Sequence, residues 1–304
     1  MAATVLAIGE SLVDVVESAE GAAEHPGGSP MNIAYGLARL GRSVKLLTAV
    51  GPDARGESIV HHLREAGVEI VAASFRDEVT SSATARLRAD GSAEYDFDVR
   101  WSVPAGVELP VADIVHTGSL GAFVEPGGSA VVALLRSRPD AIVTFDPNIR
   151  PALVGSHDAA CARFVEIARL STVLKLSDED AEWLFPRSSV DESIDRILQL
   201  GPAVVAVTRG GDGAVLATAS ERRVVPGVPV TVVDTIGAGD SFMSALIWQL
   251  AALLDAGVDP LALRDGSAFD AAELARIGAF AADCAAVTVS RAGANPPTLA
   301  DLPR

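Results

Sequence analysis

The sequence predicts an α/β fold in which a mostly parallel sheet is buried between helices. Short continuous apolar runs, such as Thr4 to Ile8 and Val44 to Val50, alternate along the chain with longer helical segments. Runs of this length are typical of central strands that are covered on both faces. The alternation of strand and helix is the pattern of repeated crossover units, which favours parallel strands.

A second observation is a break in this alternation between about residues 74 and 101. Residues 84–88 and 94–98 alternate in polarity on either side of Asp90 and Gly91, which form a strong hairpin signal. We therefore place this segment outside the main sheet, as a small β lid. Such a lid can close over a ligand or pair with a second copy of the chain, and it can also be a plain surface hairpin.

Composition narrows the classes of function. The 304 residues are 49% hydrophobic and 21% charged, which suits a single globular domain with a large core. The net charge of −16 argues against nucleic acid and anionic membranes as partners. The most apolar run, Phe242 to Leu254, is too short to span a membrane, which takes about 20 residues. Because Met1 to Thr4 carry no basic leader, we expect a cytoplasmic protein.

The central motif lies at Val233 to Phe242. An apolar, strand-like run from Val228 to Val233 leads into a turn of small residues, and a long apolar helix begins near Gly239. In such a turn the backbone N–H groups converge with the positive end of the helix dipole, so the turn is a candidate anion site. Asp240 follows directly. The residue pattern alone leaves two interpretations of it open, a helix cap and a catalytic base.

Polar residues also follow several other predicted strands, where ligands gather in an open parallel sheet. The acids of Ser177 to Asp180 begin a helix, and they can be dipole partners or can hold magnesium through its waters. Two other chemistries are excluded. Gly51 to Ser58 has the glycine spacing of a P-loop, but Glu57 stands where that loop needs lysine, and no GxGxxG pattern for a nicotinamide cofactor follows the first strand.

Asp234 to Asp240, which reads DTIGAGD, resembles the DTxGAGD signature of the ribokinase-like (PfkB) carbohydrate kinases. Other motifs extend the resemblance nearly from end to end, and bacterial and plant fructokinases are the most similar members. These motifs are Glu10 to Asp14, Gly27-Gly28 with Asn32, Leu37 to Gly41, Val50 to Gly56, Phe145 to Arg150, Lys175 to Asp180, Thr208 to Gly213 and Gly293-Ala294. The resemblance implies a ribokinase-like three-layer αβα sandwich over residues 1–304, with a β lid from about residues 12–26 and 74–101.

The resemblance also implies roles for individual residues. Asp240 would be the base, and Gly237, Ala238 and Gly239 would form the anion hole. The residues that would bind sugar are Asp14, Gly27, Gly28, Asn32, Arg150 and Asp240. Those that would bind ATP are Lys175, Ser177, Thr208, Gly210, Gly213, Gly239 and Asn295. Asp180 would bind Mg²⁺ through water, and Asp234 and Ile236 are candidates for a K⁺ site.

One element departs from the family pattern. The family's NxxE element, which orders the water shell of magnesium, reads Ser177 to Asp180 here, so an aspartate on a shorter arm replaces the glutamate. The implied activity is ATP-dependent phosphorylation of a sugar hydroxyl, with O6 of D-fructose as the first expectation. Alternatives are a 2-keto-3-deoxygluconate kinase, another sugar kinase such as a ribokinase, and a non-catalytic sugar or nucleotide sensor. A homodimer through the β lid is also expected.

Overall fold

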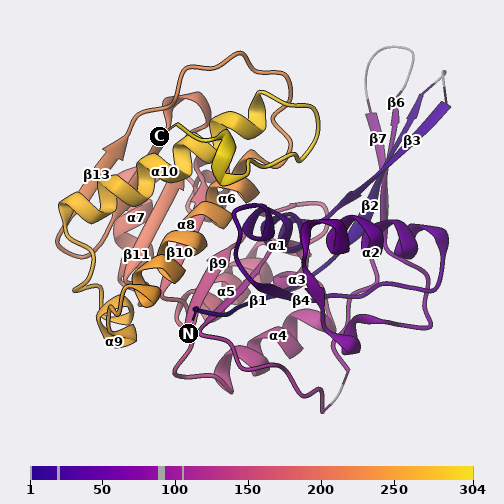
Figure 1. Cartoon of the computed structure of the whole chain (residues 1–304), viewed down its shortest axis with the longest axis horizontal. Coiled ribbons are helices and arrows are strands. Elements are labelled where there is room, and N and C mark those ends of the chain that lie inside the picture. The colour runs from indigo at the N-terminus through magenta and orange to yellow at the C-terminus, as the bar shows by residue number, and fades with distance from the viewer. Residues whose placement is uncertain (1, 19–20, 88–92, 105, 304) are drawn as a thin grey trace.

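The computed structural model describes residues 2–18, 21–87, 93–104 and 106–303. Within them, the main sheet has nine strands in the order β13-β12-β11-β10-β9-β8-β1-β4-β5. In chain order the strands are β1 (Val5–Ile8), β4 (Val44–Leu47), β5 (Glu69–Ile70), β8 (Ile114–Gly118), β9 (Ile142–Asp146), β10 (Val173–Ser177), β11 (Val204–Thr208), β12 (Ala214–Ala217) and β13 (Arg222–Val225). In this sheet β11, β10, β9, β8, β1, β4 and β5 run parallel to one another. Strands β12 and β13 extend the sheet beyond β11, each antiparallel to the strand before it (Figure 1).

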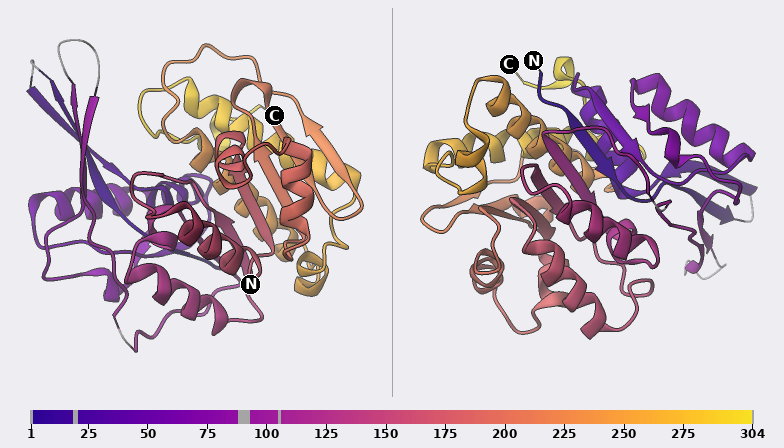
Figure 2. Two further views of the ribbon diagram at one scale, coloured as in Figure 1. Left: turned by 180° about the vertical axis from the view of Figure 1, so that it is seen from behind. Right: turned by 90° about the horizontal axis from the view of Figure 1, so that it is seen from below.

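Helices cover both faces of this sheet (Figure 2). One face packs against α1 (Ser29–Arg39), α2 (Ala54–Ala66), α8 (Ala238–Asp255), α9 (Pro260–Arg264) and α10 (Ala271–Val289). The other packs against α3 (Ser119–Phe123), α4 (Gly127–Arg136), α5 (His157–Ala168), α6 (Asp178–Leu184) and α7 (Val190–Leu198). Successive residues of β1 enter the two cores alternately, which confirms the expected three-layer αβα sandwich. Among the described helices, none has the length and apolar composition to cross a membrane.

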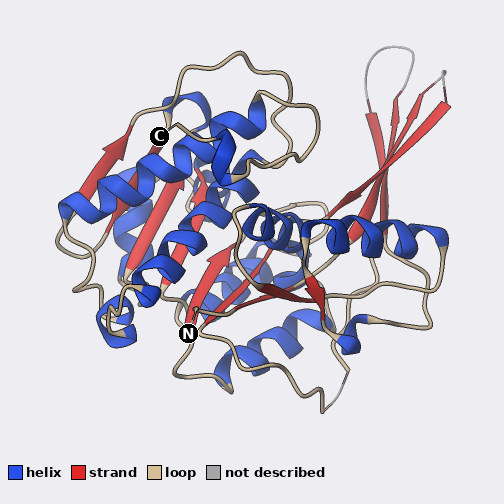
Figure 3. Cartoon of the chain, in the orientation of Figure 1, coloured by secondary structure: helices blue, strands red, loops and turns tan. Residues whose placement is uncertain are grey.

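The expected second sheet is also present. Its four strands, in the order β3-β2-β6-β7, are β2 (Leu12–Ser18), β3 (Gly21–Gly27), β6 (Ser82–Leu87) and β7 (Ala93–Asp98). Strands β2 and β6 pair in parallel, while β3 and β7 pair antiparallel at the two edges. Figure 3 shows this sheet projecting from the body of the protein. The turn predicted at Asp90 and Gly91 lies outside the described residues.

The prediction of a strand at Val228 to Val233 is wrong, because this segment is a loop. Val228, Val230, Val232 and Val233 are all exposed. The last sheet strand, β13, ends at Val225, and the N–H groups of Val233 and Asp234 instead donate to the carbonyl of Val289 at the end of α10. A run of valines reports β propensity, but it carries no information on whether a neighbouring strand is there to pair with.

Candidate active site

The turn before α8 is built on a left-handed glycine. Gly237 has φ 78° and caps the helix, and a Cβ added there would lie 2.8 Å from the Cβ of Ala294. A side chain at position 237 would therefore be both strained and in collision. The N–H groups of the first helical turn have no intrahelical acceptor, so those of Gly239 and Asp240 remain for a ligand. The turn thus has the form of an anion site.

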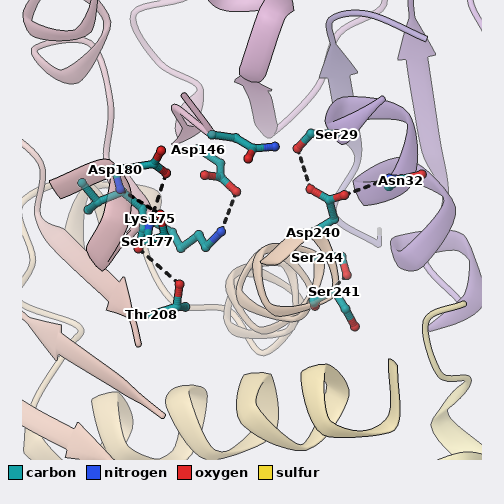
Figure 4. A network of polar contacts seen from close by, with 12 residues as sticks. Ser29, Asn32, Asp146, Lys175, Ser177, Asp180, Thr208, Asp240, Ser241 and Ser244 are labelled. Carbon is teal, nitrogen blue, oxygen red and sulfur yellow. Dashed lines mark hydrogen bonds and ion pairs between the residues drawn. The ribbon is translucent and has the colours of Figure 1, made fainter. Parts of the chain in front are cut away.

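Asp240 does not cap its own helix. Its Oδ1 accepts a hydrogen bond from Ser29 Oγ (2.6 Å), and its Oδ2 accepts one from Asn32 Nδ2 (2.8 Å). Both partners belong to the first turn of α1, as Figure 4 shows, and α8 has no side-chain cap. Of the two interpretations left open by the sequence, the cap is therefore excluded. The carboxylate of Asp240 is therefore held between the first turns of α1 and α8, next to the turn at Gly237.

The start of α1 is itself fixed by a close approach of two backbones. Gly28 precedes the helix with φ 108°, and a Cβ there would lie 2.7 Å from the carbonyl oxygen of Glu10. Pro30 stands in the first turn, where its missing N–H has no cost. The tight contact of Gly28 with the end of β1 brings Ser29 and Asn32 up to Asp240. Ser29 was not singled out in the sequence, since a serine opening a helix is most often a cap.

A buried ion pair lies beside the turn. Lys175 Nζ on β10 donates to Asp146 Oδ2 on the neighbouring strand β9 at 2.8 Å, and both side chains are at most 5% exposed. Burial raises the pKa of Asp146 to about 6, against the effect of Lys175, so the carboxyl is ionised at neutral pH. Burial lowers the pKa of Lys175, but the carboxylates of Asp146, Asp240 and Asp180 together outweigh this effect, so the pKa is raised and the ammonium stays protonated. Both residues belong to motifs that the sequence analysis identified, but the sequence did not predict that they contact each other.

Ser177 and Asp180 form a capping box at the start of α6. Ser177 Oγ accepts from the N–H of Asp180 at 3.0 Å, and Asp180 Oδ2 accepts from the N–H of Ser177 at 3.3 Å. Asp180 Oδ1 also accepts from the N–H of Ile149 at 2.9 Å, which ties the loop after β9 to α6. The helix-start interpretation of these acids is therefore confirmed. Thr208 lies nearby and donates from Oγ1 to the carbonyl of Leu176 at 3.4 Å (Figure 4).

The residues expected to bind sugar line the junction with the second sheet. Asp14 lies on β2, and a Cβ added at Gly27 would come within 2.1 Å of its Oδ2, so a side chain at position 27 would displace the Asp14 carboxylate. Desolvation raises the pKa of Asp14, and the charges of His25 and Arg150 act in the opposite direction. Arg150 itself lies in the loop after β9. Its Nη1 donates to the carbonyl of Ile149 at 3.0 Å, and the side chain is exposed.

The remaining predicted residues lie in exposed turns. Gly210 begins a 3₁₀ turn between β11 and β12 that ends before Gly213, and Asn295 lies in the segment after α10. Asp234 accepts from the N–H of Ile236 at 3.0 Å and from the N–H of Gly293 at 2.9 Å. These two hydrogen bonds tie the loop before α8 to the segment after α10 and lower the pKa of Asp234. No contact links Gly210, Gly213 or Asn295 to Asp240 within the described residues.

Glu10 is a buried carboxyl to which the sequence assigned no role. It follows β1, is 2% exposed, and its Oε2 accepts from the N–H of Gly121 at 2.6 Å. Burial raises the pKa of Glu10 to about 7, and the charge of Asp240 adds to this effect. In the sequence, its position after the carboxyl end of a central strand indicated only that Glu10 lies near the ligand-binding edge of the sheet.

The fold and this geometry agree with a known protein family. The model of the pfkB family carbohydrate kinases matches residues 2–301. The chain belongs to that family. It is therefore a carbohydrate kinase, an enzyme rather than a non-catalytic sensor.

Curated relatives support the same assignment. The chain is 30% identical over 283 residues to a fructokinase from Rhizobium leguminosarum bv. trifolii, covering 86% of each chain. It is 31% identical over 321 residues to fructokinase-2 from Oryza sativa subsp. japonica, covering 97% of this chain and 91% of the relative.

Solved structures share the whole fold. The fructokinase from Xylella fastidiosa with bound ATP has a TM-score of 0.83 at 25% identity, over 98% of this chain and 96% of the other. The fructokinase from Vibrio cholerae O395, with bound fructose, ADP and calcium ion, has a TM-score of 0.81 at 25% identity, over 98% and 97% of the two chains.

The left-handed turn can be tested with two alanine variants. We expect Gly237→Ala to lower the free energy of unfolding by at least about 1–2 kcal/mol, the cost of left-handed backbone for a residue with a Cβ, and to lower turnover. Gly257→Ala is the matched control, since Gly257 ends α8 at φ 88° with no atom near its added Cβ. That control should lose stability through strain alone and keep its turnover. Equal turnover of the two variants, measured beside urea unfolding, would contradict the anion-site assignment.

Glu10 makes stability depend on pH in a defined direction. Between about pH 5 and 7 the unfolded carboxyl has lost its proton while the folded one, with a pKa of about 7, keeps it. The native state then binds more protons, so stability falls as pH rises through this window. In Glu10→Gln, whose amide oxygen can still accept from Gly121, the free energy of unfolding should depend less steeply on pH. Parallel urea titrations from pH 5 to 8 measure this, and identical slopes would rule it out.

Proposed function

We propose that the protein is an ATP-dependent fructokinase, which transfers the γ-phosphoryl group of ATP to O6 of D-fructose. The observation that carries the proposal is the carboxylate of Asp240, fixed by Ser29 and Asn32 at the N-terminus of α8. The relatives named fructokinase, and the fructokinase from Vibrio cholerae with bound fructose and ADP, support fructose as the acceptor.

Asp240 accepts the proton of the attacking hydroxyl. The two hydrogen bonds from α1 orient its carboxylate for this role as a general base. The sugar oxygen attacks the γ-phosphorus in line, and the turn of Gly237, Ala238 and Gly239, with the N–H group of Gly239, stabilises the charge on the transferring group. The base and the anion site come from adjacent residues of one turn, so proton acceptance and charge stabilisation act at the same place.

Asp14, Gly27, Gly28, Asn32 and Arg150 bind the sugar in this proposal. Asp14 and the backbone of the two glycines belong to the junction between the second sheet and α1, so the sheet of β2, β3, β6 and β7 can act as a lid that covers the sugar and excludes water. The edge strands β3 and β7 have no further strand partner within the described residues. They give a second copy of the lid a place to pair, which supports a homodimer.

ATP binds along Lys175, Ser177, Thr208, Gly210, Gly213, Gly239 and Asn295. The described residues hold no cluster of three side chains that could cage a metal ion. In this proposal Mg²⁺ would be held mainly by waters and phosphate oxygens, with Asp180 holding its water shell. The ion supplies positive charge to the phosphates. Asp234 and Ile236, in the loop tied to Gly293, are the residues proposed to border a K⁺ ion.

A 2-keto-3-deoxygluconate kinase is the second candidate, and one observation favours it. Arg150 is exposed and its charge acts on Asp14, so its guanidinium is able to meet the carboxylate of a sugar acid.

A substrate panel separates these candidates. Release of ADP is measured with fructose, 2-keto-3-deoxygluconate, ribose and adenosine as acceptors, each with ATP and Mg²⁺. We expect the highest kcat/KM for fructose, because the relatives supporting the assignment are fructokinases. A preference for the sugar acid that is lost in Arg150→Ala would overturn the choice of fructose and keep the kinase.

The base assignment has its own test. Asp240→Asn keeps the shape of the side chain but cannot accept a proton, so kcat should fall by about 10²–10⁴-fold while fructose binding, measured by calorimetry, persists. Asp158→Asn is the matched control, because Asp158 is also an aspartate in a first helical turn but is fully exposed. Near-normal kcat in a folded Asp240→Asn would remove Asp240 as the base.

A further inference from the structure

Lysine is rare in this chain, and one of its lysines is buried. Of the 24 Lys and Arg residues, only Lys45 and Lys175 are lysines. Lys45 on β4 is partly exposed and pairs with Glu69 at 2.8 Å. Lys175 is 4% exposed. An ammonium group loses favourable hydration when it is buried, so the position of Lys175 has a cost in stability that an apolar residue would avoid.

The ammonium of Lys175 is directed at the turn before α8. A Cβ built on Gly239 would lie 2.9 Å from Lys175 Nζ, so the ammonium lies beside that residue of the turn. Figure 4 shows the Lys175 side chain extended toward Asp146. Of its three N–H donors, one goes to Asp146 Oδ2. Two sources of positive charge, the N-terminus of α8 and Lys175, therefore lie side by side. Such an arrangement becomes favourable when an anion binds between them.

Asp146 holds Lys175 in this place. The register pairs Val173 with Thr144 and Leu174 with Phe145, so the next residues along the two strands, Lys175 and Asp146, lie beside each other. The carboxylates of Asp146, Asp240 and Asp180 are the charged groups that act on Lys175, and each favours its protonated form. Because both partners sit on central strands of the sheet, the ammonium has little freedom to move away from the turn.

We propose that Lys175 contacts the phosphoryl group during its transfer and that Asp146 is the residue that positions it. This inference rests on the proposed kinase function and goes beyond nucleotide binding. The bond from the sugar oxygen to the γ-phosphorus forms as the bond from that phosphorus to the β,γ-bridging oxygen breaks. The hydroxyl proton passes to Asp240, and the electron pair of the broken bond stays on ADP. Lys175 keeps its proton and donates to a non-bridging oxygen of the transferring group.

With two lysines in the chain, the contact can be observed without any change to Lys175. The full chain is labelled with [ε-¹³C]lysine, and Lys45→Arg assigns the two NMR signals. Mg²⁺ is added with ADP, or with a non-hydrolysable ATP analogue, at concentrations that calorimetry shows to be saturating. We expect the analogue to shift the signal of Lys175 more than ADP does, because only the analogue carries a γ-phosphoryl group. The signal of Lys45 should stay in place.

Two other outcomes overturn the proposal. If both nucleotides bind and the Lys175 signal responds to neither, or equally to both, the contact with the transferring group is disproved while the kinase function stands. If calorimetry detects no nucleotide binding at all, the proposed kinase function fails, and this inference fails with it.

Kinetics give an independent test. Lys175→Met should lower kcat by about 100-fold or more, as removal of a preorganised donor does, with little change in the KM for the sugar. Lys45→Met is the matched control and should keep both constants. Since Lys175→Met leaves Asp146 buried and unpaired, Asp146→Asn/Lys175→Met removes both charges and should show the same loss of kcat in a stably folded protein. Near-normal kcat in the double variant would overturn the role of Lys175.

Asp146→Asn tests the positioning role. The neutral amide no longer holds the ammonium against the turn, so kcat should fall, and the analogue should shift the Lys175 signal less than in the unchanged protein. A full NMR response together with normal kcat would remove Asp146 from the proposal.

Discussion

The N-terminus of α8 is the feature on which the rest of the site depends. A helix that begins at a left-handed glycine presents unpaired N–H groups and the positive end of its dipole to one small volume. That volume attracts negative charge, and the protein supplies one permanent carboxylate there, that of Asp240. The hydrogen bonds from Ser29 and Asn32 hold this carboxylate at the edge of the turn, so the N–H groups stay available for a ligand.

The sheet supplies the second part of the arrangement. Its parallel strands end at one edge, which brings side chains from β1, β9, β10 and β11 to the base of the turn. Asp146 and Lys175 share that edge as a buried ion pair. A buried pair of charges contributes little net stability compared with apolar residues of similar size, so its presence at this edge is better explained by chemistry than by packing.

Glycines decide how closely the elements approach one another. Gly28 lets α1 meet the end of β1, and Gly237 lets the turn meet the segment after α10. At both positions an added Cβ would lie less than 3.0 Å from a neighbouring atom, so the backbone or the neighbouring residue would have to move. The site is therefore held together by contacts between backbones of segments that lie far apart in the sequence.

The sequence by itself determined the α/β class, the small second sheet and the turn at Gly237 to Asp240, because these follow from periodicity and local backbone preference. The valine run at 228–233 was misjudged for the same reason, since propensity cannot show whether a strand partner exists. Only the tertiary structure decided that Asp240 faces Ser29 and Asn32 and that Lys175 pairs with Asp146. Those contacts join residues from 29 to more than 200 positions apart, and a side chain's partner depends on how the elements pack, which no local pattern encodes.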